Sequence, residues 1–314
     1  MFFVGGESKV KDYYDVVVIG GGPAGLSAAL YATRAGLSCL VIESNITGGQ
    51  MNETDIIENY PGIEEIQGAV LGERMKRHAE KFGAEFHTAT VTEVDFSGQV
   101  KKIHLDDGRT VSSEVVIIAT GASHRKLNVP GEREFAAKGV SYCATCDGHF
   151  FKGKKVALVG GGDTAITEAL YLSNLASEVV VIHRRDKLRA TKILQERAFK
   201  KENIKFVWNT IVKEIRGKDK VEELLLENKR TGEVFTLKVD GVFIAIGIVP
   251  NTDLFKGKVN LDSQGYIITD ENMETNIRGV YAAGDVRAKR LRQVITAVSD
   301  GAIAASHAAE TYFG

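Results

Sequence analysis

The stretch Gly20-Gly21-Gly22-Pro23-Ala24-Gly25 decides the fold of this 314-residue chain. A β-branched run at residues 15–19 precedes it, and an alanine-rich stretch at residues 26–34, typical of a helix, follows it. A second apolar run, residues 37–42, then ends at Glu43. Strand, glycine turn, helix and strand in this order predict a βαβ dinucleotide-binding unit, because the glycines let the backbone approach a pyrophosphate at the helix N-terminus.

The same pattern returns in the middle of the chain. A strand at residues 155–159 leads into Gly160-Gly161-Gly162-Asp163-Thr164-Ala165, and a helical stretch at residues 166–175 and a strand at residues 179–182 follow. We therefore expect two nucleotide-binding sites in one chain.

The second strands of the two units end in opposite chemistry. Glu43 and His183 both lie 23 positions beyond the first glycine of their turn. A carboxylate at this place suits the free hydroxyls of a ribose. His183 is instead followed by Arg184 and Arg185, with Arg189 nearby, and guanidinium groups suit a ribose 2′-phosphate. The second site is predicted to prefer NADPH to NADH, and the alternative is a solvated basic strand end.

Chain length and the remaining apolar runs predict two domains, since the chain exceeds the usual size of one core. Apolar runs at residues 115–121 and 242–247 end in small residues and close the two units. Residues 249–252 contain a proline and predict a turn at a boundary. The C-terminal part has an apolar strand ending in Gly284-Asp285 and an alanine-rich helix at residues 294–312, but no fingerprint of its own.

We therefore expect an α/β fold of two Rossmann-like dinucleotide-binding domains, with the second inserted into the first. The first domain is predicted to comprise residues 1–123 and 251–314, and the inserted domain residues 124–250. The C-terminal part is most simply placed back against the first domain.

The inserted domain carries the dithiol motif Cys143-Ala144-Thr145-Cys146-Asp147. Its spacing is that of a redox C-x-x-C, in which both sulfurs close one small disulfide ring. A structural zinc site is the rival interpretation, but it needs four ligands. The third cysteine, Cys39, lies in a predicted buried strand and is interpreted as an inert core thiol, and His149 alone leaves a ligand set incomplete. We expect no metal.

Asp147 follows the second cysteine directly and could relay the proton that thiol–disulfide chemistry must move. The alternative is an Asx turn leading into Gly148. Two dinucleotide sites and a dithiol together imply electron transfer from a nicotinamide, through a second dinucleotide, to a disulfide. Because hydride transfer to a disulfide needs a two-electron relay, the second cofactor is predicted to be a flavin.

Charge and hydropathy exclude several other classes. Lys and Arg number 40 and Asp and Glu 41, so the chain offers no electrostatic footprint for nucleic acid or an anionic membrane. The apolar runs are far shorter than the 18 or more residues of a membrane span, and the N-terminus lacks the apolar region of a secretory signal. We expect a cytoplasmic protein.

The motifs resemble the low-molecular-weight thioredoxin reductases of the flavoprotein disulfide reductase superfamily over residues 14–314. The resemblance depends on the dithiol motif lying inside the second nucleotide-binding domain, on His183-Arg184-Arg185-Asp186 with Arg189, and on Gly284-Asp285. Glutathione-reductase-like relatives place their dithiol in the FAD domain with a wider spacing. The resemblance implies FAD in the first domain, NADPH in the inserted domain, a homodimer, and thioredoxin or a glutaredoxin-like protein as the partner.

The resemblance also implies roles for individual residues. Cys146 would take electrons from the flavin, Cys143 would exchange with the disulfide of the partner, and Asp147 would act as general acid. The residues implied to bind FAD are Gly20, Gly22, Gly25, Glu43, Gly49, Gln50, Asn59, Gly121, Asp285, Arg292, Gln293 and Ala297. Those implied to bind NADPH are Gly160, Gly162, Ala165, His183, Arg184, Arg185 and Arg189.

One dithiol cannot face the flavin and a protein partner together, so the resemblance implies a domain rotation with hinges near residues 123–127 and 248–252. Residues 1–11 add a segment ahead of the first strand and are expected to fray or to cover an edge. The alternative enzyme is a flavoprotein reductase of a peroxidase system, which normally carries an added N-terminal domain. A ferredoxin–NADP reductase would lack the dithiol, and a redox sensor or zinc-stabilised binding protein would need no turnover.

Overall fold

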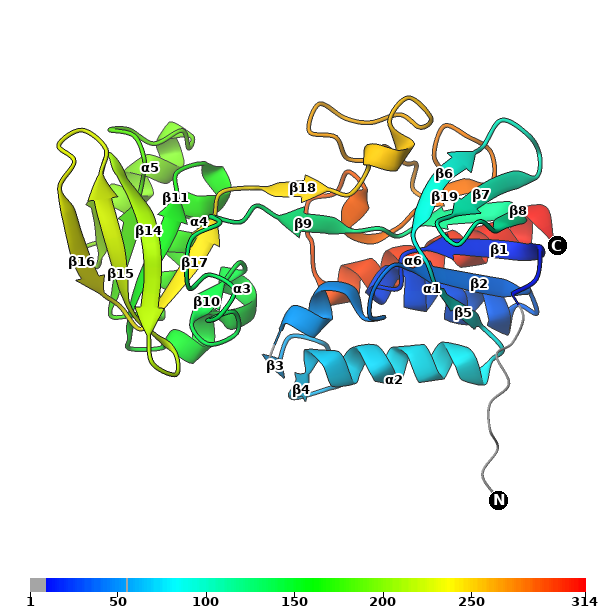
Figure 1. Ribbon diagram of the computed structural model, residues 1–314, viewed down its shortest axis with the longest axis horizontal. Coiled ribbons are helices and arrows are strands. Elements are labelled where there is room, and N and C mark those ends of the chain that lie inside the picture. Colours follow the sequence, from blue (N-terminus) through cyan, green and yellow to red (C-terminus); the bar gives the residue numbers. More distant parts are fainter. Residues whose placement is uncertain (1–9, 55) are drawn as a thin grey trace, which may run out of the picture. The chain divides into compact units, whose positions relative to one another are not determined.

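The computed structural model describes residues 10–54 and 56–314 and divides into two compact units (Figure 1). One unit contains the chain up to Ser123 together with Val249–Gly314, and the other contains His124–Ile248. Residues 1–9, most of the N-terminal segment expected to fray or cover an edge, lie outside the described residues.

The first unit is built on a seven-stranded mixed sheet. Its strands run in the order β5 (Glu85–Thr88), β2 (Cys39–Glu43), β1 (Tyr13–Ile19), β8 (Thr110–Ile118), β7 (Lys101–Leu105) and β6 (Val91–Asp95), and β19 (Val280–Ala282) pairs with β8. The strands β5, β2, β1, β8 and β19 are parallel, whereas β6 and β7 are antiparallel. The helices are α1 (Pro23–Arg34), α2 (Gly68–Lys81) and α6 (Val294–Tyr312).

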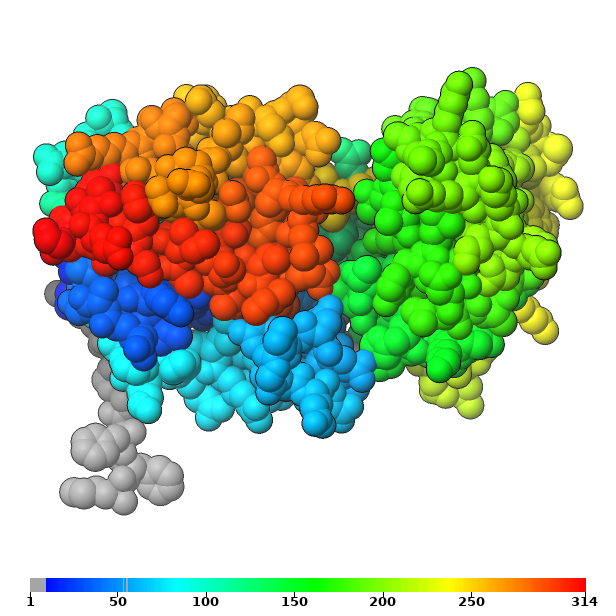
Figure 2. All heavy atoms as spheres, turned by 180° about the vertical axis from the view of Figure 1, so that it is seen from behind, coloured from blue at the N-terminus to red at the C-terminus, as the bar shows by residue number. Residues whose placement is uncertain are grey.

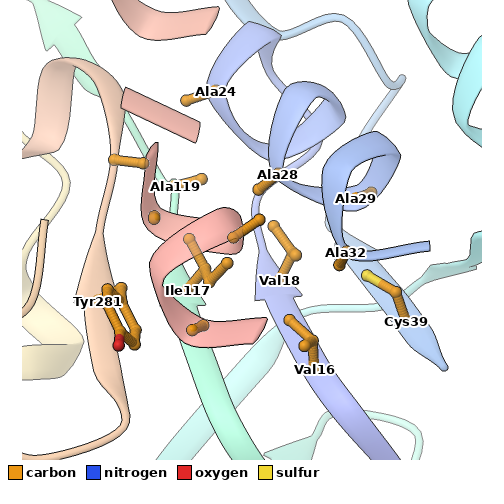
Figure 3. Packing of buried hydrophobic residues seen from close by; sticks show 14 of the residues in the cluster. Val16, Val18, Ala24, Ala28, Ala29, Ala32, Cys39, Ile117, Ala119 and Tyr281 are labelled. Atoms are coloured by element: carbon orange, nitrogen blue, oxygen red, sulfur yellow. The ribbon is translucent and has the colours of Figure 1, made fainter. Parts of the chain in front are cut away.

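Small residues let α1 and α6 pack closely over this sheet. In Figure 3 the alanines of α1 lie over Val16 and Val18 of β1, and all are buried. A Cβ added to Gly301 of α6 would lie 2.0 Å from the carbonyl oxygen of Ala24, so the two helices meet backbone to backbone. Figure 2 shows the same contact from outside, with C-terminal residues in red directly beside N-terminal residues in blue. The alanine-rich composition thus brings the C-terminal helix onto the N-terminal βαβ unit.

The second unit repeats the parallel architecture. Its five strands run in the order β10 (Val140–Ser141), β17 (Gly241–Ala245), β11 (Lys155–Gly160), β12 (Glu178–Ile182) and β13 (Ile204–Val207), and all are parallel. Its main helices are α4 (Asp163–Leu172) and α5 (Lys192–Phe199), and its antiparallel sheet is formed by β14 (Thr210–Gly217), β15 (Val221–Asn228) and β16 (Val234–Lys238). The predicted α/β class with two Rossmann-like units is confirmed.

Short elements complete the two units. They are η1 (Gly49–Glu53), β3 (Ile56–Ile57), β4 (Ile66–Gln67), β9 (Ala122–His124), α3 (Ala144–Asp147), η2 (Gly148–Phe151), β18 (Ile248–Pro250), η3 (Asp253–Phe255) and η4 (Gly284–Val286).

Two local predictions differ from the structure. The turn expected from residue 249 onward begins later, because β18 extends to Pro250 and pairs with β9. Proline is tolerated there, since a two-stranded ribbon leaves one edge of each strand without a ladder partner. The second predicted helix spans 163–172 rather than 166–175, because Gly162 caps it and residues 173–175 form turns.

Neither a membrane span nor a metal cluster is found in the described part of the chain. No helix there is long and apolar enough to cross a membrane. No group of three or more His, Cys, Asp and Glu side chains there is arranged to hold a metal ion.

Candidate active site

The first glycine turn lies at the carboxyl end of β1. Gly20 has a φ of 109°, and a Cβ added to Gly25 would lie 1.9 Å from the carbonyl oxygen of Gly20, so α1 packs directly on the turn. A Cβ added to Gly22 would meet only the Cα of Gly49, at 3.9 Å, within the described residues. The backbone at Gly22 is therefore open to a ligand at the start of α1.

Glu43 ends β2 beside this turn. Its Oε2 accepts a hydrogen bond from the amide of Gly21 at 2.8 Å, and its Oε1 accepts one from the amide of Asn45 at 2.9 Å. The predicted ribose-binding carboxylate is thus held against the glycine turn, with lone pairs left for further donors.

The C-terminal part brings Asp285 to the same place. A Cβ added to Gly284 would lie 2.8 Å from the Cβ of Ala24 and 3.6 Å from that of Ala297. The segments η4 and α6 therefore meet the glycine turn at the start of α1, although they lie far from it in sequence.

Two buried polar atoms near this convergence lack hydrogen bonds among the residues that the structure describes: Oδ1 of Asp285 and Nε of Arg292. Lys289 Nζ lies 3.9 Å from Asp285 Oδ1, beyond hydrogen-bond distance. Burial raises the pKa of Asp285 above its ordinary value. Buried polar atoms are normally paired, so an acceptor and a donor of this kind fit a polar ligand such as the ribityl and pyrophosphate part of a flavin nucleotide.

The other predicted flavin-side residues contact different parts of the same unit. Asn59 Nδ2 donates to Oε1 of Gln293 at 3.0 Å, and Gln293 caps α6. Gln50 Nε2 donates to the carbonyl oxygen of Ala122. The carbonyl oxygen of Gly121 accepts from the amide of Asn251 at 3.0 Å.

Sequence reasoning missed Asp300, whose carboxylate binds the first residue of η4 and two cations that follow it. Asp300 is 7% exposed and lies on α6. Its carboxylate accepts hydrogen bonds from the amide of Gly284 at 3.0 Å, from Lys289 Nζ at 2.9 Å and from Arg287 Nη1 at 3.2 Å. One buried carboxylate therefore neutralises two cations and holds the backbone that precedes Asp285.

The second glycine turn, at the end of β11, has the same construction. A Cβ added to Gly160 would lie 2.5 Å from the Cβ of Ala165, whereas one added to Gly162 would meet no described atom within 4 Å. The His183 ring lies against Gly161, and its Nε2 is buried without a hydrogen-bond partner within residues 10–54 and 56–314. Burial lowers the pKa of His183, so the ring stays neutral near pH 7.

The basic strand end is tied to this glycine turn. The amides of Arg189 and Ala190 donate to the carbonyl oxygen of Gly161 at 2.7 and 3.1 Å. The amide of Thr191 donates to Oδ1 of Asp163 at 2.6 Å, an anchor that the sequence did not reveal. The side chains of Arg184, Arg185 and Arg189 are exposed. Three cations thus follow a strand end that lies beside an open helix N-terminus.

The dithiol lies in the second unit as a disulfide between Cys143 and Cys146, with their Cα atoms 5.3 Å apart. Cys143 caps α3, and the amides of Cys146 and Asp147 donate to its carbonyl oxygen. Sequence reasoning also missed Ser141. Its hydroxyl group donates a hydrogen bond to Oδ2 of Asp147 at 2.6 Å and accepts one from the amide of Cys143 at 3.1 Å. The carboxyl group of Asp147 is therefore held next to the disulfide.

Glu168 of α4 is a further residue near the disulfide that sequence reasoning missed. Its carboxyl group accepts a hydrogen bond from the amide of Ala144, between the two cysteines. Burial raises the pKa of Glu168 to about 7. An acidic residue in an amphipathic helix is normally solvated, so nothing in the sequence indicated this contact.

Known proteins match almost the whole chain. The family model described as pyridine nucleotide-disulphide oxidoreductase matches residues 14–301. The chain is 50% identical over 300 residues to thioredoxin reductase of Bacillus subtilis (strain 168), which covers 95% of the chain and 94% of the relative. It is 48% identical over 306 residues to thioredoxin reductase of Peptoclostridium acidaminophilum, over 95% of the chain and 97% of the relative.

A solved structure agrees. The crystal structure of thioredoxin reductase from Streptococcus pyogenes MGAS5005 has a TM-score of 0.92 and 48% identity, over 96% of this chain and 98% of that one. The resemblance found in the motifs is confirmed, and the protein is an oxidoreductase that works with a flavin and a nicotinamide cofactor. Family match, sequence identity and fold agree over nearly the full length, and the chain belongs to the pyridine nucleotide-disulphide oxidoreductase family.

Proposed function

We propose that the protein is a thioredoxin-disulfide reductase, which uses NADPH and FAD to reduce its Cys143–Cys146 disulfide and then reduces the disulfide of thioredoxin or a glutaredoxin-like protein. The observation that carries this proposal is the Cys143–Cys146 disulfide, with Asp147 held beside it by Ser141. The similar proteins that are named thioredoxin reductase support the same partner.

We assign FAD to the domain formed by residues 1–123 and 251–314. The open backbone at Gly22 supports this assignment, and so do the buried atoms of Asp285 and Arg292 that have no hydrogen-bond partner among the described residues. A bound flavin supplies a two-electron relay between a hydride donor and a disulfide. Glu43 would hold the ribose of the ADP half, and the other residues implied by the resemblance would line the remainder.

We assign NADPH to the domain formed by residues 124–250. Gly162 offers an open helix N-terminus for the pyrophosphate, and the three arginines after His183 supply the positive charge that a 2′-phosphate requires. Neutral His183 can accept or donate one hydrogen bond without adding charge.

The dithiol then performs thiol–disulfide exchange. The Cys143 thiolate attacks one sulfur of the partner's disulfide, which forms a mixed disulfide and releases the partner's other sulfur as a thiolate. Asp147 supplies the proton to that leaving thiolate. Asp147, now ionised, takes the proton of the Cys146 thiol, and the Cys146 thiolate attacks the sulfur of Cys143. This restores the Cys143–Cys146 disulfide, and the partner's second sulfur leaves with that proton, so that the partner is released as a dithiol. Cys146 would be the sulfur that receives two electrons when the dithiol is restored in the following cycle.

The two half-reactions require the dithiol to face the flavin and the partner in turn. We propose a rotation of one unit relative to the other, with hinges at residues 123–127 and 248–252, where the chain passes twice between the units. We also propose a homodimer, which the resemblance implies. We further propose a cytoplasmic location, since thiols are kept reduced in that compartment.

Single cysteine variants test the proposal. Cys143→Ser and Cys146→Ser should each abolish NADPH-driven reduction of thioredoxin, which is measured as the appearance of free thiols. NADPH should still bleach the flavin absorbance in both variants. Cys39→Ala is the matched control, because Cys39 is a buried core thiol and should leave the rate unchanged. A wild-type rate in either active-site variant would contradict the mechanism.

A further inference from the structure

Glu168 is a half-buried acidic residue that the proposed reaction does not use. It lies on α4, which packs beneath α3, the helix that carries the disulfide. Its one hydrogen bond within the described residues comes from the amide of Ala144, a residue that is fully buried between the two cysteines. A side chain from another helix therefore holds the first turn of α3.

The second oxygen of this carboxyl group, Oε2, is buried and has no hydrogen-bond partner among the described residues. A buried acceptor without a partner is unfavourable when the group carries a charge and much less so when it carries a proton. Burial accordingly raises the pKa of Glu168 to about 7.

The surrounding elements do not supply a compensating cation. Titratable groups on the elements packed against α4 are Cys143, Cys146 and Asp147 at α3, His149 on η2, Lys155 on β11, Glu178 on β12, and Lys192, Glu196 and Arg197 on α5; β17 has none. Lys155 and Glu178 pair with each other at 2.8 Å. Burial raises the pKa of the Glu168 carboxyl group, the hydrogen bond from the Ala144 amide lowers it, and no charged side chain contributes to the shift. When the disulfide is reduced, a negative charge forms on one of the two sulfurs. This thiolate is then the main new charge near the Glu168 carboxyl group.

We propose that Glu168 is a positioning residue for the dithiol, which holds α3 through the Ala144 amide and takes up a proton when the disulfide is reduced. The inference rests on the proposed redox role of Cys143 and Cys146.

The proton balance gives the reason. Two electrons and one proton convert the disulfide into one thiol and one thiolate, which adds one negative charge. A second proton that binds to ionised Glu168 cancels this charge, so the unit takes up two protons with two electrons and keeps its net charge. A thiolate near a carboxylate in a poorly solvated site favours this uptake, because like charges raise the pKa of the carboxyl group.

The pH dependence of the dithiol–disulfide equilibrium tests the proposal without thioredoxin or NADPH. The holoprotein is equilibrated with reduced and oxidised glutathione from pH 6 to pH 8.5, and the free thiols are trapped and counted in the peptide that contains Cys143 and Cys146. The variants are Glu168→Gln, which keeps an acceptor for Ala144 but cannot titrate, and Glu196→Gln, an exposed carboxyl group on α5 as the control.

At pH 6 Glu168 is protonated in both redox states, so wild type and Glu168→Gln should titrate with the same pH dependence. Above pH 7 only the wild type takes up the extra proton. The ratio of reduction equilibrium constants, variant to wild type, should therefore grow by roughly threefold to tenfold up to pH 8.5, which corresponds to a rise of half to one unit in the Glu168 pKa on reduction. Glu196→Gln should follow the wild type. A constant ratio for Glu168→Gln, or an equal change in the control, would overturn the proposal.

A second measurement needs no variant. In wild-type protein with the glutamate carboxyl groups labelled with carbon-13, the reduced-minus-oxidised infrared difference spectrum at pH 7.5 should show a gain of protonated glutamate. Its absence would overturn the proposal, even if Glu168→Gln fails to fold. If the wild-type disulfide does not exchange with glutathione at any ratio, both this inference and the proposed function fall, whereas normal exchange without proton uptake removes Glu168 alone.

Discussion

The hydroxyl group of Ser141 lies 2.6 Å from Oδ2 of Asp147 and holds the carboxyl group beside the disulfide. Ser141 is 5% exposed, and it also accepts the amide of Cys143, so one side chain orients both the cysteine and the acid. A proton donor acts efficiently only when its position is fixed relative to the reacting atom.

Ser141→Ala should therefore lower kcat for thioredoxin reduction by roughly tenfold while KM for NADPH stays the same, since one oriented hydrogen bond of about 1.4 kcal/mol corresponds to that factor. Steady-state kinetics with thioredoxin measure both constants. The control is Ser173→Ala, another buried serine of the same unit, whose hydroxyl donates a hydrogen bond to the carbonyl oxygen of Leu170 in its own helical turn. An unchanged kcat in Ser141→Ala would show that Asp147 needs no such support.

Replacing Arg184 and Arg185 by alanine together should raise KM for NADPH by roughly tenfold to a hundredfold and leave KM for NADH nearly unchanged. The reason is that the two guanidinium groups are expected to contact the 2′-phosphate, which NADH lacks. Initial rates with each nucleotide give the comparison, and Arg197→Ala on α5 is the control for a change in surface charge. Equal effects on the two nucleotides would support the solvated strand end instead.

The sequence predicted the parts of the site that depend on local order. Glycine is needed where the backbone turns directly from a strand into a closely packed helix, and Gly20, Gly25 and Gly160 lie at such turns. The strands and helices around them could therefore be predicted from the local sequence pattern. The dithiol was predicted in the same way, because two cysteines three residues apart can close a ring without help from distant segments.

Residues that act through tertiary contacts could not be predicted. The packing of α6 on α1 buries Asp300, and the packing of α3 on α4 buries the Oε2 atom of Glu168. Nothing in the local sequence of these helices distinguishes the two residues from solvated acidic residues. Pro250 was misjudged for a related reason, since the β9–β18 pairing joins segments more than a hundred residues apart. Local patterns carry no information on such pairs.

Asp300→Asn should weaken FAD binding and destabilise the fold. The variant keeps an acceptor for the Gly284 amide but leaves Lys289 and Arg287, whose side chains are 8% and 15% exposed, without their anion. Removing one partner of a buried ion pair typically costs about 3 kcal/mol or more. Lys289 is then free to move the remaining distance to Asp285 and to occupy the acceptor that the flavin nucleotide would use.

Two measurements check this expectation: Tm of the holoprotein, and the dissociation constant for FAD from fluorescence titration of apoprotein, which should rise by roughly tenfold. Asp253→Asn is the control, because the Asp253 carboxylate is 92% exposed and pairs with the neighbouring Lys256 on the surface. Wild-type values for both quantities would show that the network around Asp300 has no part in shaping the flavin site.

Glu168→Gln should change the pH dependence of stability in a defined direction. The pKa of Glu168 in the folded protein, about 7, lies above its ordinary value of 4.5, so the native state binds this proton more tightly than the unfolded chain does. The corresponding stability is fully present below pH 4.5 and is lost as pH rises to about 7. Glutamine cannot lose a proton, so the variant should gain on the wild type by up to about 3 kcal/mol between pH 5 and pH 8. Urea unfolding of the oxidised holoprotein at several pH values measures the difference, with Glu196→Gln as the exposed control. Parallel stability curves for Glu168→Gln and wild type would mean that the Glu168 carboxyl group has the same pKa in the folded and the unfolded protein, as a solvated carboxyl group has.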